Sequence, residues 1–193
     1  MLIVSDIHAR ADLLREVLQK FPEAQVVCLG DAVGSGSGND ATLSLLRDAK
    51  AACLKGNHEV DLLHLYSLSD ESRAQIALWP YRLVQDDVLF CHTYLDSGSS
   101  TQFWNIDSIW TAEQMFTSEN FRICFVGHSH SPGWWEWRPQ ERPVWKHADP
   151  TRALQLHRGV RYIVDVGSLG EPQRETDPRY VLWQDDIIRF TIF

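Results

Sequence analysis

Five short apolar runs of this sequence are each followed at once by side chains that bind metal ions or transfer protons. The residues that follow them are Asp6 and His8, Asp31, Asn57 and His58, His92, and finally His128 and His130. Strand ends of α/β sheets are where ligand sites form. Alternate residues of an extended segment point the same way, so we expect Asp6 and His8 to reach one common point. For the same reason His128 and His130 should share a face.

Each of these residues, taken singly, has an ordinary structural interpretation. An aspartate or asparagine can cap a helix or close a turn, and a lone histidine can be satisfied within the core. The same chemistry repeated after five apolar runs is hard to explain by solvation, and it predicts a metal site. Mixed imidazole and carboxylate ligands without thiolates suit Mn, Fe, Zn and similar ions.

The four cysteines argue against a zinc ribbon and against redox chemistry. Cys28, Cys53, Cys91 and Cys124 lie in apolar stretches and form no CxxC pair. Cysteine packs readily as a small hydrophobic residue, so we expect all four to lie in the core.

Length and composition exclude several classes of protein. The net charge of −8 over 193 residues, with no basic run, argues against binding of duplex nucleic acid. No apolar run approaches the ~18 residues that span a bilayer, and no signal peptide precedes the first apolar run. We therefore expect a cytoplasmic protein that binds no membrane, with a single domain over residues 1–193. Whether it forms a homo-oligomer is left open.

The apolar pattern predicts an α/β fold. Strands are expected at Gln25–Asp31 and Ala51–Gly56. The second half of the chain is mostly β and begins with a hairpin that turns at Asp86-Asp87. It also contains a polar loop at Ser97–Thr101. Two packed sheets with outer helices would accommodate this order. The expected helices are Ala9–Phe21, Ala41–Ala51 with a cap at Asn39 or Asp40, Leu62–Leu68, Glu71–Leu78, and Thr111–Phe116 with a capping box of Thr111 and Gln114.

The ordered elements D-x-H, GD, GNHE, H and GHSH resemble the motif set of the calcineurin-like metallophosphoesterase superfamily. The resemblance extends from Asp6 to the C-terminal strands. It implies an α/β fold of four layers, an αββα sandwich with two mixed β-sheets flanked by helices. It also implies a metal-dependent phosphoric ester hydrolase with two divalent metal ions, Mn in the first place, with Fe, Zn, Ni or Mg as alternatives.

The resemblance assigns a role to each motif residue. Asp6, His8 and His130 would bind one metal ion, Asn57, His92 and His128 the other, and Asp31 would bridge the two. A metal-bridging hydroxide would attack a phosphomonoester or phosphodiester of a small phosphorylated substrate. Asn57 and His58 would contact the phosphate, and His58 would help the leaving oxygen depart. Glu59 and Asp61 could orient ligands or begin a helix.

Two further stretches bear on the substrate. The glycine-rich stretch 30–38 can bring backbone amides to a phosphate or form a flexible edge of the site. It lacks the arginine of the GDxVDRG motif, which argues against the alternatives of a protein serine/threonine phosphatase or a dinucleoside polyphosphate phosphatase. Residues Asp165–Gln173 resemble the NPGSVGQPR stretch of small bacterial and archaeal phosphodiesterase-like members, with Gln173 in place of its arginine.

The alternative from another class is a non-catalytic interaction module on the same fold, like the retromer subunit, which typically loses motif residues. The histidine after Asn57 is present here, which favours the enzyme. Trp134, Trp135 and Trp137 follow the GHSH motif and are expected in the core or an interface rather than stacked on a flat ligand. Trp104 and Trp110 could cover the site. His64, His147 and His157 match no motif element and are expected at the surface or in structural roles.

Overall fold

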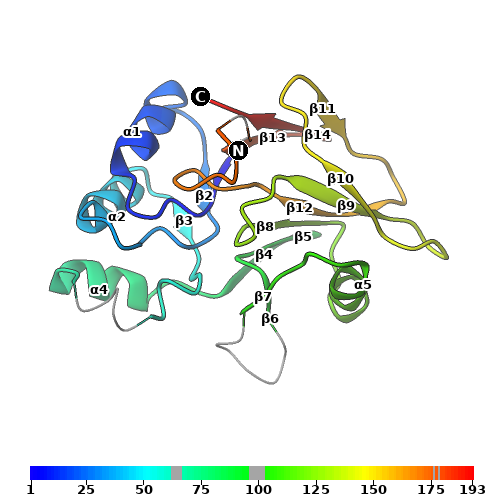
Figure 1. Cartoon of the computed structure of the whole chain (residues 1–193), viewed down its shortest axis with the longest axis horizontal. Coiled ribbons are helices and arrows are strands. Elements are labelled where there is room, and N and C mark those ends of the chain that lie inside the picture. The colour runs from blue at the N-terminus through cyan, green and yellow to red at the C-terminus, as the bar shows by residue number, and fades with distance from the viewer. Residues whose placement is uncertain (62–66, 96–102, 176, 178) are drawn as a thin grey trace.

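Two mixed sheets lie face to face at the centre of the molecule, with helices outside both (Figure 1). The computed structural model describes residues 1–61, 67–95, 103–175, 177 and 179–193. The predicted helix Leu62–Leu68 falls largely outside these residues, and the predicted loop Ser97–Thr101 and His64 fall wholly outside them. Within the described chain the helices are α1 (Ala11–Lys20), α2 (Asn39–Asp48), α4 (Asp70–Ala77) and α5 (Ile109–Ser118).

The first sheet carries the N-terminal strands, and within the described residues its order is β11-β14-β13-β1-β2-β3. Strands β1, β2 and β3 run parallel, with Val4 opposite Cys28 and Cys28 opposite Cys53, whereas β13 lies antiparallel to β1. The bounds are β11 (Ala153–Gln155), β14 (Ile187–Thr191), β13 (Tyr180–Gln184), β1 (Leu2–Val4), β2 (Val26–Cys28) and β3 (Ala52–Cys53).

The second sheet has the order β10-β9-β12-β8-β5-β4 within the described residues. Strands β12, β8 and β5 run parallel and the outer strands pair antiparallel, so this sheet is mixed too. A short ribbon pairs β6 (Tyr94–Leu95) with β7 (Phe103–Trp104). The bounds are β10 (Val144–His147), β9 (Gly133–Trp137), β12 (Arg161–Asp165), β8 (Ile123–Val126), β5 (Val88–Cys91) and β4 (Arg82–Gln85).

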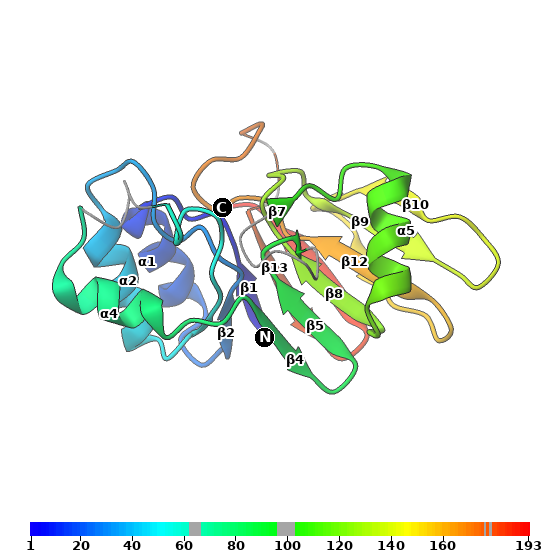
Figure 2. The same cartoon turned by 90° about the horizontal axis from the view of Figure 1, so that it is seen from below.

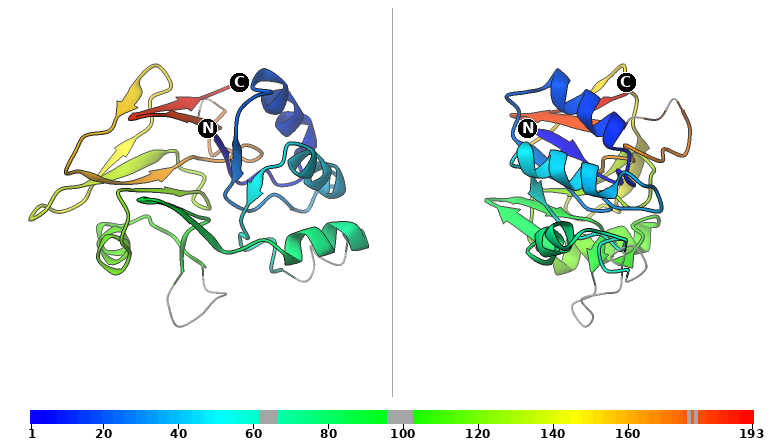
Figure 3. Two further views of the ribbon diagram at one scale, coloured as in Figure 1. Left: turned by 180° about the vertical axis from the view of Figure 1, so that it is seen from behind. Right: turned by 90° about the vertical axis from the view of Figure 1, so that its left-hand side faces the viewer.

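Three apolar cores separate the four layers. Along β1, Leu2 and Val4 face the core shared with α1 and α2, while Ile3 faces the core between the sheets. Along β8, Phe125 faces that central core, and Cys124 faces the core beneath α5. Figures 2 and 3 show α1, α2 and α4 on one side of the molecule and α5 on the opposite side. The predicted αββα sandwich is therefore confirmed.

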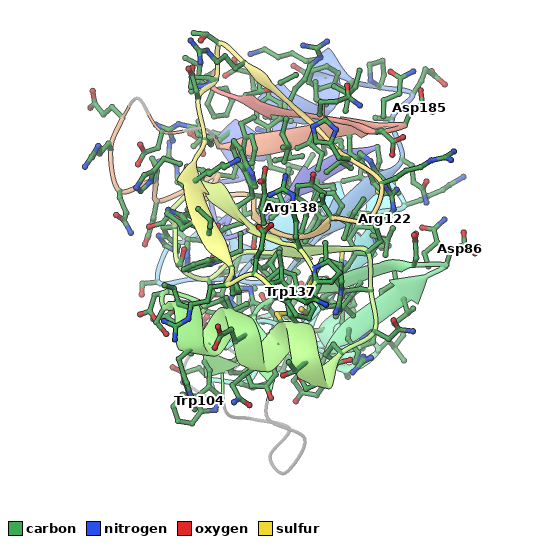
Figure 4. All side chains as sticks on the ribbon, turned by 90° about the vertical axis from the view of Figure 1, so that its right-hand side faces the viewer. Asp86, Trp104, Arg122, Trp137, Arg138 and Asp185 are labelled. Atoms are coloured by element: carbon green, nitrogen blue, oxygen red, sulfur yellow. The ribbon has the colours of Figure 1, made fainter. Side chains whose placement is uncertain are left out.

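At one end of the central core, an arginine side chain joins a hairpin turn of one sheet to a hairpin turn of the other. Arg122, at the start of β8, donates from Nε to Asp87 Oδ2 and from an Nη to Asp186 Oδ1, both at 3.0 Å. Asp87 belongs to the β4–β5 turn, which confirms the predicted hairpin, and Asp186 belongs to the β13–β14 turn. Figure 4 shows Arg122 between the neighbouring turn residues Asp86 and Asp185. One guanidinium thus bridges the two sheets.

The cap predicted for α2 at Asn39 or Asp40 is wrong, because other partners bind both side chains. Asn39 lies inside α2, and its amide bonds the backbone N–H and C=O of Gly34 at 2.9 Å each. Asp40 instead accepts from the hydroxyl of Ser69, the residue that caps α4. Helix α5 begins earlier than predicted, with a capping box formed by Ser108 and Thr111, so the box predicted for Thr111 and Gln114 is wrong.

The other local predictions are closer to the structure. Helix α1 spans Ala11–Lys20 within the predicted range, and α4 starts one residue before the predicted Glu71. All four cysteines are buried and free, as predicted. Among the described residues, none of the helices combines the length and the apolar character that crossing a membrane requires.

The packing of the central core gives a stability prediction. Phe125 is fully buried and its ring lies 5.4 Å from the ring of Phe90 and 5.3 Å from that of Trp183. Phe125→Ala should lower the free energy of unfolding by about 3–5 kcal/mol, through lost burial and the cavity left behind. Urea unfolding followed by circular dichroism, with a chelator present throughout, measures this change. Leu78→Ala, at a position 85% exposed, should change stability by less than about 0.5 kcal/mol.

Candidate metal centre

All eight residues singled out from the sequence lie at one edge of the two sheets. Asp6, Asp31 and Asn57 follow β1, β2 and β3, while His92 and His128 follow β5 and β8. Because these strands run parallel within each sheet, their carboxyl ends meet at the same edge. The first sheet therefore supplies the carboxylates and Asn57, and the second sheet supplies three of the histidines.

The backbone that presents these side chains differs from the expected extended form. Positive φ values occur at five of the eight residues: Asp6 (52°), His8 (48°), Asp31 (49°), His128 (68°) and His130 (55°). The expectation that Asp6 and His8 converge as alternate residues of a strand is wrong in its reason, because β1 has already ended at Val4. Left-handed backbone at non-glycine residues is costly and concentrates at functional sites.

One group of candidate ligands surrounds the carboxylate of Asp6. His130 Nε2 lies 3.2 Å from Asp6 Oδ1 and 3.2 Å from His8 Nε2. His8 Nε2 lies 3.9 Å from the same Asp6 oxygen. The Nδ1–H of His130 donates to the carbonyl oxygen of Glu171 at 2.7 Å, which leaves Nε2 as the ring nitrogen that faces Asp6.

A second group surrounds the carboxylate of Asp31. His92 Nε2 lies 3.3 Å from Asp31 Oδ2 and 3.2 Å from the side-chain oxygen of Asn57. Ligand atoms of Asp31, His92 and His128 all lie within 4.8 Å of one another. Asp31 also forms such a group with His8 and His58, so it stands between the two clusters.

His58 lies on the more open side of the site. Its side chain is 26% exposed, and its Nε2 is 3.9 Å from Asp31 Oδ2. Its backbone N–H donates to Asp31 Oδ1 at 2.9 Å, and its ring packs edge-on against the ring of His8. The structure thus brings His58 to Asp31 in a position that solvent can still reach.

In the site, burial and the charges of neighbouring groups shift the pKa values of the side chains in opposite directions. Burial of Asp31 favours its neutral form, but His92 outweighs this and holds the pKa of Asp31 below its ordinary value. The pKa of Asp6 is lowered against burial in the same way, by His92 and His130. Conversely, Asp31 and Asp6 overcome burial and raise the pKa of His92 to about 9. The two carboxylates therefore stabilise positive charge placed between them.

The donor set fits divalent metal ions. Asp6 Oδ1 is buried and has no hydrogen-bond partner within the described part of the chain, although the site holds it 3.2 Å from an imidazole nitrogen. Nitrogen and oxygen ligands about 2.0–2.2 Å from one ion are separated from each other by about this distance. Oxygen and imidazole donors without sulfur suit Mn, Fe and Zn.

Glu59, which sequence reasoning left open, supports the site from beneath. Its Oε2 accepts from the N–H groups of Asp31 (2.8 Å) and Gly56 (2.7 Å), and its Oε1 accepts from Ala32 (2.8 Å) and Val33 (3.1 Å). Burial and the charge of Asp31 raise the pKa of Glu59 to about 7, while these donors favour its ionised form. One side chain thus locks the loop of Asp31 to the loop of Asn57.

Asp165 plays a similar part for the loop of His128 and His130. Its Oδ2 accepts from the hydroxyl of Ser129 at 2.6 Å, and its Oδ1 accepts from the N–H of Gly167 at 2.9 Å. Burial raises the pKa of Asp165 to about 8. Sequence reasoning named Asp165 only as the first residue of the stretch that resembles NPGSVGQPR, although it too ends an apolar strand.

Two glycines allow carboxylates to approach the backbone closely. A Cβ placed on Gly127 would lie 2.4 Å from Asp6 Oδ2, and one placed on Gly56 would lie 2.1 Å from Asp31 Oδ1. The backbone N–H of His128 uses this space to donate to Asp6 Oδ2 at 3.0 Å. The glycines of the GH and GN motifs are therefore needed for space beside the two aspartates.

The start of the glycine-rich loop, Trp134 and Trp137 have structural roles. The N–H groups of Asp31, Ala32 and Val33 bond Glu59, and that of Gly34 bonds Asn39, so these four amides are already engaged. Trp134 stacks on Phe190 and Trp137 on Phe116, as the expectation of core packing requires.

The aromatic residue beside the ligands is one that sequence reasoning missed. The ring of Phe103 lies 5.9 Å from the ring of His92 and 6.4 Å from that of His128. Trp104 and Trp110 are instead 43% and 65% exposed. Figure 4 shows Trp104 at the edge of the molecule. His147 and His157 are exposed, as expected.

Comparison with known proteins now identifies the family. The sequence matches the calcineurin-like phosphoesterase family over residues 1–189. The chain belongs to this family. It is 26% identical over 196 residues to an uncharacterized protein of Methanocaldococcus jannaschii, covering 89% of this chain and 76% of that protein.

Solved structures share the fold of this calcineurin-like phosphoesterase. A metallophosphoesterase from Sphaerobacter thermophilus superposes with a TM-score of 0.82 at 23% identity, covering all of this chain and 88% of the other. A phosphoesterase from E. coli superposes with a TM-score of 0.53 at 14% identity, covering 99% of this chain and 91% of the other. At these identities the likeness concerns the fold.

The support from Glu59 generates a prediction. Glu59→Gln places an amide NH₂ against two backbone N–H donors, so it should lower the free energy of unfolding by about 3 kcal/mol. Unfolding in urea with a chelator present measures this without any contribution from bound metal. The matched change Glu23→Gln, at an exposed position, should have little effect. Equal stability of the two variants would show that the Glu59 contacts do not hold the loops.

Proposed function

We propose that this phosphoesterase uses two divalent metal ions to hydrolyse a phosphomonoester or phosphodiester of a small molecule. The observation that carries the proposal is the convergence of two ligand groups, one on Asp6 and one on Asp31, at a common edge of the sheets. When bound, two such ions would supply a nucleophile at neutral pH and clamp the phosphate oxygens.

In this proposal each ligand group takes one ion. Asp6, His8 and His130 would hold the first, and Asn57, His92 and His128 would hold the second. Asp31 would contribute to both, which its place between the two groups supports. Mn is proposed first for both positions, with Fe and Zn as alternatives, because oxygen and imidazole nitrogen donors suit all three ions.

His58 is proposed as the catalytic residue that acts on the leaving oxygen. It stands beside Asp31 on the more open side of the site, where a phosphate group can approach it. An imidazole N–H there can bond the phosphate and then pass its proton to the departing oxygen. Asn57 precedes it and is proposed to contact the same phosphate.

The substrate is proposed to be a small phosphorylated molecule. The net charge of −8 disfavours long polyanions such as duplex nucleic acid. Two bound cations would offset this charge locally, within the site, and favour a compact phosphate ester.

The proposal is tested by metal analysis together with hydrolysis of p-nitrophenyl phosphate and bis-p-nitrophenyl phosphate in the presence of Mn²⁺. Bound metal and turnover of either ester would support the enzyme. A protein that takes up no metal and cleaves neither ester would instead favour a non-catalytic interaction module on this fold.

Asp31→Asn should abolish turnover and lower the amount of bound metal at both positions, because a neutral amide replaces the proposed bridging carboxylate. Metal content by mass spectrometry and the rate on the preferred ester are the measurements. Asp48→Asn, the same change at an exposed position on α2, should leave both unchanged. Retained activity in Asp31→Asn would contradict the assignment.

His58→Ala should lower kcat by about 10²- to 10⁴-fold, the usual contribution of a proton-transferring side chain, while bound metal stays at the level of the unmodified protein. His157→Ala, at an exposed histidine outside the site, serves as the control. A parallel fall in metal content would identify His58 as a ligand, which its grouping with His8 and Asp31 makes worth testing.

A further inference from the structure

We propose that a pocket beside the metal centre, between residues 106–107 and the β9–β10 hairpin, binds a flat heteroaromatic ring of the substrate. This inference rests on the proposed function, because it names part of the molecule that the metal centre would cleave. The pocket is lined by Ile106, Asp107, Ser129, Ser131, Trp135, Trp145 and His147.

The position of the pocket links it to the site. Ser129 and Ser131 belong to the loop that carries His128 and His130. On the opposite side, Ile106 and Asp107 follow Phe103, whose ring packs beside His92 and His128. The same two segments therefore border the candidate ligands and the pocket, so a substrate held by its phosphate can extend from one to the other.

The walls of the pocket are aromatic and already ordered. The rings of Trp135 and Trp145 lie 5.3 Å apart and are inclined by 53°, so they form a corner. The indole N–H of Trp135 donates to the carbonyl oxygen of Ile106 at 3.1 Å and ties the opposite wall to β9. Trp135 is only 5% exposed, whereas Trp145 is half-buried and offers a ring face for stacking.

Two polar side chains of the pocket can form hydrogen bonds with the edge of a bound ring. The indole N–H of Trp145 donates to His147 Nδ1 at 3.4 Å, so the neutral imidazole carries its proton on Nε2 and presents a hydrogen-bond donor. The carboxylate of Asp107 presents acceptors. A ring that carries both an acceptor and a donor, as nucleobases do, matches this pair of groups.

The volume of the pocket decides how much of a substrate it can hold. It measures about 210 Å³, below the roughly 300–1,000 Å³ of sites that enclose a whole small ligand. It therefore suits one ring system rather than an entire substrate. His147, expected at the surface or in a structural role, becomes a specificity-determining residue in this proposal.

Binding of adenosine, which lacks phosphate, tests the pocket separately from catalysis. In ¹⁵N-labelled protein treated with chelator, the indole N–H signals of Trp145 and Trp135 should shift saturably with millimolar adenosine and not with glycerol. Single Trp→Phe variants assign the signals, and the exposed Trp110 should not respond. Absence of a shift at both Trp145 and Trp135 would overturn the proposal.

A kinetic comparison then asks whether the pocket serves the substrate. The ratio of kcat/KM for adenosine 5′-monophosphate to that for glycerol phosphate, measured by phosphate release, should fall about tenfold or more in Trp145→Ala. His147→Ala should lower the same ratio, and Trp110→Ala should leave it unchanged. An unaltered ratio in Trp145→Ala, with hydrolysis intact, would overturn the pocket assignment while the proposed function stands. Saturable adenosine binding without hydrolysis of any ester would overturn the proposed function while the ring pocket stands.

Discussion

Two aspartates that are almost wholly removed from water, Asp6 and Asp31, impose the main physical constraint on this structure. An ionised carboxylate is stable inside a protein only when cations or N–H donors lie within reach. Here those partners are the backbone N–H of His128 and the ring of His130 for Asp6, and the backbone N–H of His58 and the ring of His92 for Asp31. Because most of these partners come from the opposite sheet, the carboxylates also bind the edges of the two sheets together.

The precision of this arrangement depends on strain that the surrounding layers offset. Five candidate site residues hold left-handed backbone, each at a cost of about 1–3 kcal/mol. The buried side chains of Glu59 and Asp165 hold the loops in this form, and three apolar cores hold the strands beneath them. A rigid base of this kind suits chemistry that requires several ligands at fixed separations.

Predictions from sequence succeeded where one local cause dominates and failed where distant partners compete. The hairpin that turns at Asp86-Asp87 was predicted correctly, because turn residues between two β-like runs specify it locally. The cap predicted for α2 failed at Asp40 because that carboxylate bonds Ser69, the capping residue of a later helix, while the Asn39 amide closes the preceding loop onto Gly34. Such competition arises when segments far apart in the sequence come together in the fold, and the local preference of a residue for a capping position does not include it.

The sequence by itself determined which side chains are candidate ligands, the order of the motifs after apolar runs and hence the family, because side-chain type and spacing are properties of the chain alone. Only the tertiary structure decided that Glu59 clamps two loops, that Phe103 rather than Trp104 lies beside the ligands, and that His147 borders an aromatic pocket. These facts depend on strand register and on loop torsions such as the positive φ of Asp6 and Asp31. They emerge only when residues far apart in the chain are packed together, since each conformation is stabilised by partners from other segments.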